Sequence, residues 1–176
     1  KKIKVVEGNA YDYSMYINEK KNIIQNQNKN NKHNYALFLE TAGPLFPGDN
    51  QIKGLNMNEI FTEKNWFPPL RNFFDNLEKL LNLEVKIASH PRSRHLNNFP
   101  DYYGNREILK EKIISTASKA KILISRNSAG LSFGPIFKKP IIMVISNELK
   151  LYDTEREVSN PFAQELGVKI VNINNE

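Results

Sequence analysis

The chain has 176 residues, of which 40% are hydrophobic, 25% charged and 10% aromatic, as is typical of one water-soluble globular domain. It contains no cysteine, which excludes disulfide bonds, a thiolate nucleophile and any cysteine-ligated metal site. The net charge of +6 admits an anionic partner, but lysine is concentrated in asparagine-rich stretches, which favours a general compositional bias instead.

Short apolar runs alternate with stretches of helical periodicity along the chain. The N-terminal part is predicted to hold a strand at residues 3–6, a partly helical stretch over 11–24 and a polar linker over 26–34. Further strands are predicted at residues 35–40, 85–88, 122–124, 140–145 and 168–171. Helices are predicted at residues 67–83, 106–120, 130–137 and 158–166, with a loop over 45–64.

The strands are continuously apolar instead of alternating, which indicates a parallel sheet covered by helices on both faces. The expected fold class is α/β, with a Rossmann-like, doubly wound and mostly parallel sheet. Ligands of such sheets bind beyond the carboxyl ends of the strands. The loops at residues 41–44, 89–92 and 125–130 are therefore the candidate binding segments.

The 125–130 loop follows one predicted strand and opens the next helix. Ser128 can cap that helix, and Ala129 leaves the backbone open to a ligand, with Ser125 and Asn127 as polar neighbours. Free N–H groups at a helix start favour an anion. An ordinary helix cap with small residues for close packing explains the same pattern.

His90, Pro91 and Arg92 directly follow another predicted strand. An imidazole at a strand end can donate to a phosphate or sugar oxygen, and an arginine can bind phosphate through two hydrogen bonds. A surface histidine at the end of a strand is the alternative interpretation. The two loops support each other because both should open onto the same crevice.

Further candidates are Thr41 and Gly43 after the first sheet strand, Arg106 at a predicted helix start, and Glu148 beyond the 140–145 strand. A solvent-exposed side chain is the favoured interpretation of Arg106, and packing or solubility explains Glu148 equally well. The chain has neither the Gly-x-Gly-x-x-Gly spacing of dinucleotide sites nor a Walker A motif. Its histidines lack zinc-site spacing, so no metal site is predicted.

Four segments resemble the C-terminal lobe of GT-B glycosyltransferases that build bacterial capsule and lipopolysaccharide. These are Ala88–Arg92 with its His-Pro motif, residues 115–120, Ile122–Ala129 with its serine motif, and residues 138–142. Bacterial sialyltransferases, polysialyltransferases and polyglycerol-phosphate transferases belong to this group of enzymes. Residues 3–12 are similar to the last strand and hinge leaving the N-terminal lobe.

In this family the His-Pro histidine and the later serine or threonine hold the phosphate and sugar of the nucleotide. The resemblance assigns those roles to His90 and Ser128. The family usually has a threonine or paired serines where this chain has Asn127-Ser128-Ala129. The chain departs from the family pattern at that point.

The resemblance implies an inter-lobe hinge and linker at residues 1–34 and a nucleotide-sugar-binding domain at 35–176. The acceptor lobe, with the catalytic base, would lie upstream, so this part alone would bind the donor without turnover. The donor would be a CMP-, UDP- or GDP-linked sugar used without a metal or other cofactor. The partners would be that donor and a glycan acceptor, without nucleic acid.

A cytoplasmic location is expected, and the lack of cysteine is compatible with it. No apolar run is long enough to span a bilayer, and the N-terminus lacks the long apolar core of a signal peptide. Peripheral contact with the anionic inner membrane face stays open. Two other functions also stay open: a nucleotide-sugar 2-epimerase, which would need carboxylates in the cleft, and a non-enzymatic module that binds anions or proteins.

Overall fold

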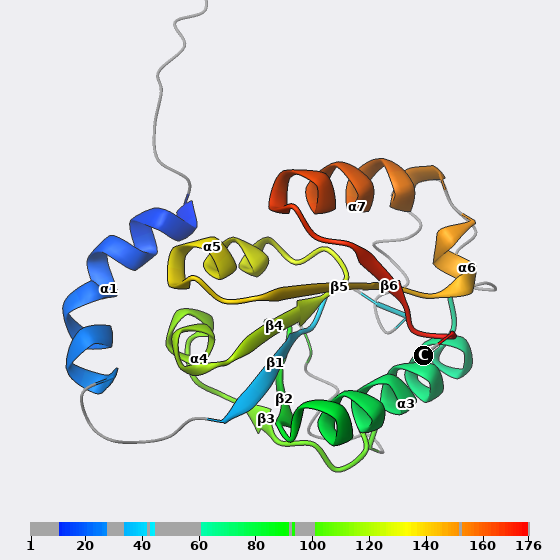
Figure 1. Ribbon diagram of the computed structural model, residues 1–176, viewed down its shortest axis with the longest axis horizontal. Coiled ribbons are helices and arrows are strands. Elements are labelled where there is room, and N and C mark those ends of the chain that lie inside the picture. Colours follow the sequence, from blue (N-terminus) through cyan, green and yellow to red (C-terminus); the bar gives the residue numbers. More distant parts are fainter. Residues whose placement is uncertain are drawn as a thin grey trace, which may run out of the picture.

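A parallel β-sheet forms the centre of the molecule, seen in the computed structural model in Figure 1. The structure describes residues 11–27, 34–41, 43–44, 61–91, 93, 101–151 and 153–175. Within these ranges the strands are β1 Tyr35–Leu39, β2 Glu84–Ala88, β3 Ile108–Leu109, β4 Ile122–Ser125, β5 Ile141–Ile145 and β6 Ile170–Asn172. They form one six-stranded sheet, all of whose neighbours pair in parallel, in the order β3-β2-β1-β4-β5-β6. This is the doubly wound Rossmann-like order, so the predicted fold class is confirmed.

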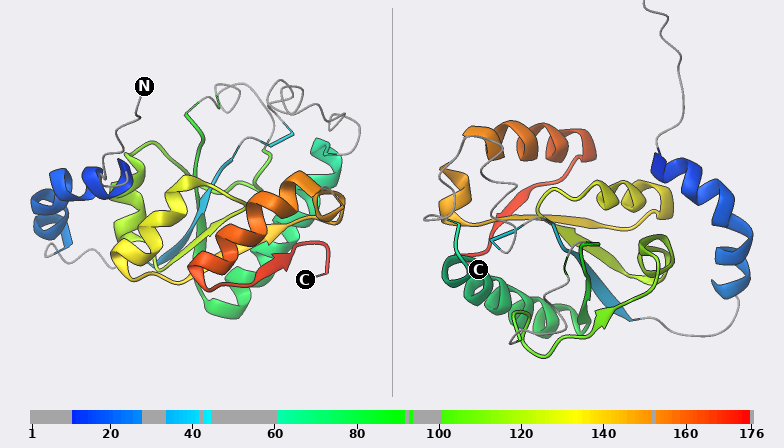
Figure 2. Two further views of the ribbon diagram at one scale, coloured as in Figure 1. Left: turned by 90° about the horizontal axis from the view of Figure 1, so that it is seen from above. Right: turned by 180° about the vertical axis from the view of Figure 1, so that it is seen from behind.

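Helices cover both faces of this sheet. The helices of the described ranges are α1 Tyr11–Gln27, α3 Glu63–Leu81, α4 Ile113–Lys119, the 3-10 helix η3 Ala129–Ser132, α5 Phe133–Phe137, α6 Asn147–Lys150 and α7 Asp153–Leu166. Helix α3 lies on one side of the sheet, and α5 and α7 lie on the other (Figure 1). Helix α1 is the outermost element beside α4 and α5, and both further views show it there (Figure 2).

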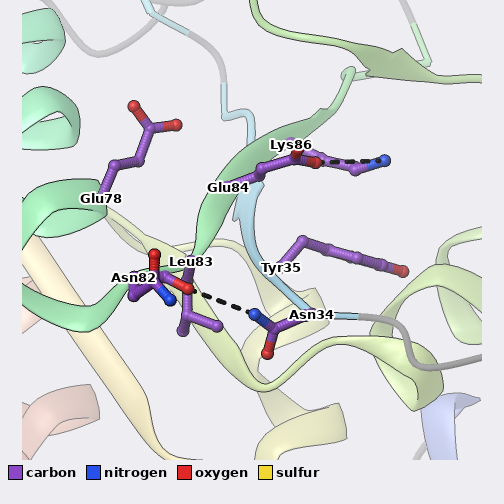
Figure 3. A pocket seen from close by; sticks show the side chains of 7 residues that line it. All are labelled: Asn34, Tyr35, Glu78, Asn82, Leu83, Glu84 and Lys86. Atoms are coloured by element: carbon purple, nitrogen blue, oxygen red, sulfur yellow. Dashed lines mark hydrogen bonds and ion pairs between the residues drawn. The ribbon is translucent and has the colours of Figure 1, made fainter.

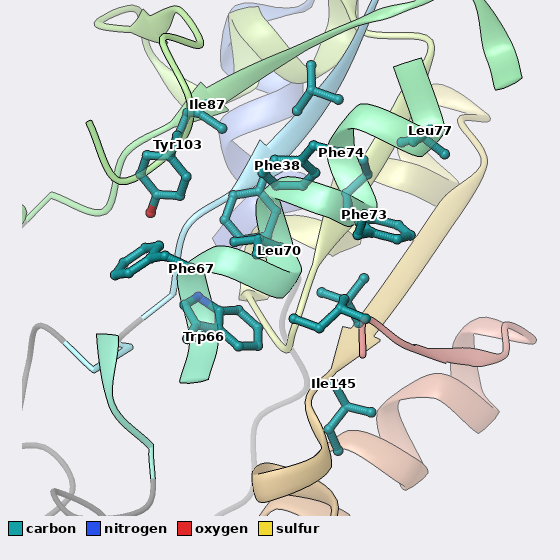
Figure 4. Close-up of a cluster of buried hydrophobic side chains, with 14 of the residues drawn as sticks. Phe38, Trp66, Phe67, Leu70, Phe73, Phe74, Leu77, Ile87, Tyr103 and Ile145 are labelled. Carbon is teal, nitrogen blue, oxygen red and sulfur yellow. The ribbon is translucent and has the colours of Figure 1, made fainter. Parts of the chain in front are cut away.

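The face under α3 is packed largely with aromatic side chains (Figure 4). Phe38 of β1 meets Phe74 of α3 edge to face, with 5.2 Å between the ring centroids. On the opposite face, Leu37 and Leu39 of β1 pack with residues of α4, α5 and α7. Strand β1 is therefore buried on both sides, as its continuous apolar sequence predicts, and each large side chain contributes about 1.5–3 kcal/mol by leaving water.

The prediction of a helix over residues 106–120 is wrong in its first half. Ile108 and Leu109 form the edge strand β3, which pairs with Ile87 and Ala88 of β2, and the helix begins only at Ile113. Ile108 and Leu109 lie at helical spacing from Ile113 and Ile114, so the sequence pattern does not distinguish the strand from the helix that follows it.

Helix α3 begins earlier than predicted, at Glu63. Thr62 caps it by accepting a hydrogen bond from the backbone N–H of Asn65 at 3.3 Å. Pro68 and Pro69 lie inside this helix, and prolines there conceal a helix start in a sequence. The strand predicted at residues 3–6 lies outside the described residues.

Helix α1 covers all of the stretch predicted to be partly helical and extends to Gln27, into the predicted linker, and it packs onto the domain. Its Ile23 is buried, Tyr16 meets Phe137 of α5 at 5.6 Å, and Asp12 accepts a hydrogen bond from Ser132 at 2.7 Å. The division of the chain at residue 34 stays a prediction.

Candidate functional site

A crevice of about 410 Å³ opens at the carboxyl ends of β1, β2 and β4. The strand order runs outward from β1 in both directions, through β2 on one side and β4 on the other. This is the topological switch point, at which the loops of neighbouring strands diverge and leave a crevice in doubly wound sheets. The lining residues all end a strand, follow one or begin a helix: Leu39, Glu40, Thr41, Ala88, Ser89, His90, Pro91, Ile113, Arg126, Asn127, Ser128 and Ala129.

The loop after β4 is fixed by serine hydroxyls. Ser125, fully buried, donates to the carbonyl of Leu39 at 2.7 Å and accepts from the backbone N–H of Ser128 at 3.3 Å. Ser128 in turn caps η3, its hydroxyl accepting from the N–H of Gly130 at 3.2 Å. Gly130 is closely packed, since a Cβ there would lie 2.6 Å from Ile113 Cδ1 and 3.3 Å from Leu39 Cδ1, and these side chains would have to shift.

The loop after β2 makes a tight turn at the crevice. The N–H of Ser93 donates to the carbonyl of His90 at 2.8 Å, and Pro91 occupies the second position of this turn, where its fixed φ is favoured. His90 and Pro91 therefore line the crevice from the side opposite Asn127 and Ser128.

Two buried charges belong to the crevice wall, and neither was among the predicted site residues. Glu40 is 7% exposed and Arg126 is 5% exposed. The Arg126 guanidinium carbon lies 5.3 Å from the centroid of the Phe61 ring, which in turn packs edge to face on Trp66. The planar guanidinium of an arginine can bind an anion through a fork of donors.

Six of the predicted site residues come together at the crevice: Thr41, His90, Pro91, Asn127, Ser128 and Ala129. Ser125 lies behind the wall and ties β4 to β1. Gly43 lines a small adjoining cavity with Trp66 and Phe67 instead. Arg92 lies outside the described residues.

Arg106 and Glu148 lie elsewhere. Arg106 donates to Asp75 and to Glu78, each at 2.6 Å, and its guanidinium stacks 5.2 Å from the Phe74 ring centroid. Burial alone would lower the pKa of Arg106, but the two carboxylates outweigh that effect and raise it. Glu148 lies in the first turn of α6 and does not line the crevice.

A second hollow lies at the opposite, amino end of β1 and β2, which we term the amino-end groove (Figure 3). Its volume is about 670 Å³, and it is lined by Asn34, Tyr35, Glu78, Asn82, Leu83, Glu84 and Lys86. The Asn34 side chain donates to the backbone carbonyl of Asn82 at 3.2 Å across it.

The part of the chain that the structure describes contains no group of three or more histidine, aspartate or glutamate side chains placed to hold a metal ion. Nor does any of its helices combine the length and apolar character needed to cross a bilayer.

Comparisons with known proteins give a distant structural likeness. No family model matches the chain, and no curated protein matches its sequence. A crystal structure described as the glycotransferase of kitacinnamycin is similar, with 12% sequence identity and a TM-score of 0.42. The match covers 82% of this chain and 32% of that chain, so this chain spans about a third of its length. A likeness this distant carries no functional argument, and the Rossmann-like fold rests on the strand order.

Proposed function

We propose that the crevice binds the phosphate and sugar of an activated nucleotide-sugar, and that the domain is the donor-binding part of a glycosyltransferase. One observation carries this proposal: three post-strand loops converge on a crevice at the topological switch point and bring His90, Arg126 and Ser128 to it. Ligands of doubly wound sheets bind at such points.

The chemistry of the lining suits a leaving phosphate. Arg126 supplies a fixed positive charge, His90 supplies a ring donor, and Thr41, Asn127 and Ser128 supply short polar groups. Donors held in place before the reaction stabilise the charge that develops on a departing nucleotide, which is the role a metal ion has in other enzymes. Transfer without a metal is therefore part of the proposal.

The role in bacterial surface polysaccharide synthesis rests on the sequence resemblance through the His-Pro and serine motifs. In GT-B enzymes the acceptor site and the catalytic base belong to the other lobe. The domain by itself should accordingly bind the donor and transfer no sugar.

A nucleotide-sugar 2-epimerase has less support. That reaction needs carboxylates free to move protons, and the described crevice lining holds a single acid, Glu40. Both oxygens of Glu40 already accept hydrogen bonds from protein groups, Oε2 from the His90 N–H and Oε1 from the Tyr103 hydroxyl. A carboxylate engaged in this way is poorly suited to act as a base.

Calorimetric titration with CMP, UDP, GDP and CDP tests the proposal. We expect one or more of these nucleotides to bind, and His90→Ala to weaken that binding by about tenfold, which corresponds to about 1.4 kcal/mol. Asn34→Ala, in the amino-end groove, serves as the control and should leave the affinity unchanged. Failure of all four nucleotides to bind would contradict the proposal and favour a non-enzymatic module.

A further inference from the structure

Glu40 lies where three segments of the chain meet. It directly follows β1, its backbone N–H continues the β1–β2 ladder by donating to the carbonyl of Ala88 at 3.0 Å, and its side chain lines the crevice. The side chain is almost completely buried, at 7% exposure. Burying an ionised carboxylate costs several kcal/mol unless donors surround it.

The donors around Glu40 come from two distant parts of the chain. Oε2 accepts from the backbone N–H of His90 at 2.6 Å and from the hydroxyl of Ser93. Oε1 accepts from the hydroxyl of Tyr103 at 2.7 Å. Burial, reinforced by the charge of Glu40, raises the pKa of Tyr103 well above its usual range, so this phenol stays protonated and keeps donating.

These bonds fix the turn that carries His90. The carboxylate holds the turn at His90 and at Ser93, and the turn is closed by the hydrogen bond between the same two residues. Hydrogen bonds to a charged acceptor are about twice as strong as neutral ones, so this carboxylate holds the turn more firmly than a neutral side chain would. With both oxygens occupied by the protein, Glu40 acts on the crevice through the turn.

The geometry points to Glu40 as a positioning residue, which sets the place of the His90 imidazole in the donor crevice without contacting the ligand. This inference rests on the proposed function for its effect on binding. Its structural part, the anchoring of the His90 turn, is independent of any ligand. The two parts are therefore tested by separate measurements.

The first measurement is the backbone amide spectrum of the ligand-free protein. A charge-assisted hydrogen bond displaces an amide proton resonance downfield. In Glu40→Ala the His90 amide resonance should move upfield, and in Glu40→Gln it should move part of the way, because a neutral amide oxygen still accepts. Tyr103→Phe is the matched control, since it removes one donor from the same carboxylate and leaves the His90 bond in place; its His90 resonance should stay.

The second measurement is nucleotide affinity by calorimetry, using whichever of CMP, UDP, GDP and CDP binds the unmodified protein. Glu40→Ala should weaken binding by about tenfold, Glu40→Gln by less than about threefold, and Tyr103→Phe by less than about twofold. In a His90→Ala background, Glu40→Ala should add less than about twofold, because its effect passes through the imidazole.

Three outcomes would overturn the inference. One is an unchanged His90 resonance in Glu40→Ala. Another is a Glu40→Ala variant that binds nucleotide as tightly as the unmodified protein. The third is a loss of affinity on adding Glu40→Ala to His90→Ala that is as large as the loss in the unmodified protein, which would mean that Glu40 contacts the ligand directly. If the unmodified protein binds no nucleotide, the proposed function fails, and the spectra alone decide whether Glu40 anchors the turn. Should Glu40→Ala not fold, the Gln and Phe variants provide the same comparison.

Discussion

The two hollows at opposite ends of the sheet differ in how they are built. The amino-end groove is the larger, at about 670 Å³ against 410 Å³ for the crevice. Yet its Asn34, Asn82 and Glu84 are exposed, whereas the crevice contains the buried charges of Glu40 and Arg126. Volume therefore says less about function than the presence of buried charged residues in the wall of a hollow.

The difference follows from the parallel sheet. Every strand leaves the sheet at the carboxyl edge, so the loops that must turn back into helices gather there and can carry ligand groups. At the amino edge the polar groups are engaged with one another. Glu78 accepts from the N–H of Val85 at 2.7 Å, and Lys86 donates to Glu107 at 2.5 Å.

The sharpest contrast comes from removing Arg126 of the crevice wall or Arg106, which pairs with Glu78 of the amino-end groove. Arg126→Leu should weaken nucleotide binding by about ten- to a hundredfold, because a hydrogen bond to a charged group contributes about 1.5–3 kcal/mol. Arg106→Leu should leave the affinity within about twofold but lower the free energy of unfolding by about 1–3 kcal/mol, because Glu78 and Asp75 lose their partner. Calorimetry and urea unfolding check both. An equal loss of nucleotide affinity in the two variants would contradict the claim that the nucleotide binds in the crevice and not at the amino-end groove.

Alkaline unfolding tests the support behind the crevice. The pKa of Tyr103 is raised on folding, so its contribution to stability is complete below the pKa of an unfolded tyrosine, about 10, and is lost as the pH rises further. The unmodified protein should lose up to about 1.4 kcal/mol per pH unit from this group above about pH 10. Tyr103→Phe should be less stable at neutral pH by about 1 kcal/mol and should lack this part of the alkaline loss. Urea unfolding at several pH values measures the free energy of unfolding of both proteins. If that free energy falls equally steeply with pH in the unmodified protein and in Tyr103→Phe, the raised pKa of Tyr103 is contradicted.

The smallest effect is expected in the amino-end groove. Lys86 pairs with Glu107 and lies 5.4 Å from the Tyr35 ring centroid, but the carboxylate of Glu107 is largely exposed. Lys86→Ala should cost less than about 1 kcal/mol of unfolding free energy, with a smaller effect in high salt, and should not change nucleotide affinity. A marked loss of affinity would indicate that the nucleotide binds at the amino ends of the strands, which would contradict the proposed site.

The sequence predicts most of the sheet because β1, β4 and β5 are short, nearly continuous apolar runs. It hides β3, which has two residues and whose Ile108 and Leu109 fall into helical spacing with Ile113. The start of α3 is hidden as well, since Pro68 and Pro69 interrupt the helical pattern just after the Thr62 cap.

For the site, the sequence indicates which residues stand at strand ends, and this brings His90 and Ser128 into view. It does not indicate which charged residues become buried there. Glu40 and Arg126 each adjoin an apolar strand, a position where most charged side chains are solvated. Their burial depends on Tyr103 and Phe61, which come from other parts of the chain. The sequence feature that could have pointed to Glu40 and Arg126 is a charged residue directly after a buried strand.

The most direct test of the account maps the binding position of a nucleotide on the isotope-labelled protein by following backbone amide resonances during titration. The account predicts that the shifted amides gather at residues 40–41, 89–91 and 126–130, around the crevice at the carboxyl ends of β1, β2 and β4. Shifts gathered instead at residues 34–35 and 82–86, or no shifts with any of the four nucleotides, would contradict it.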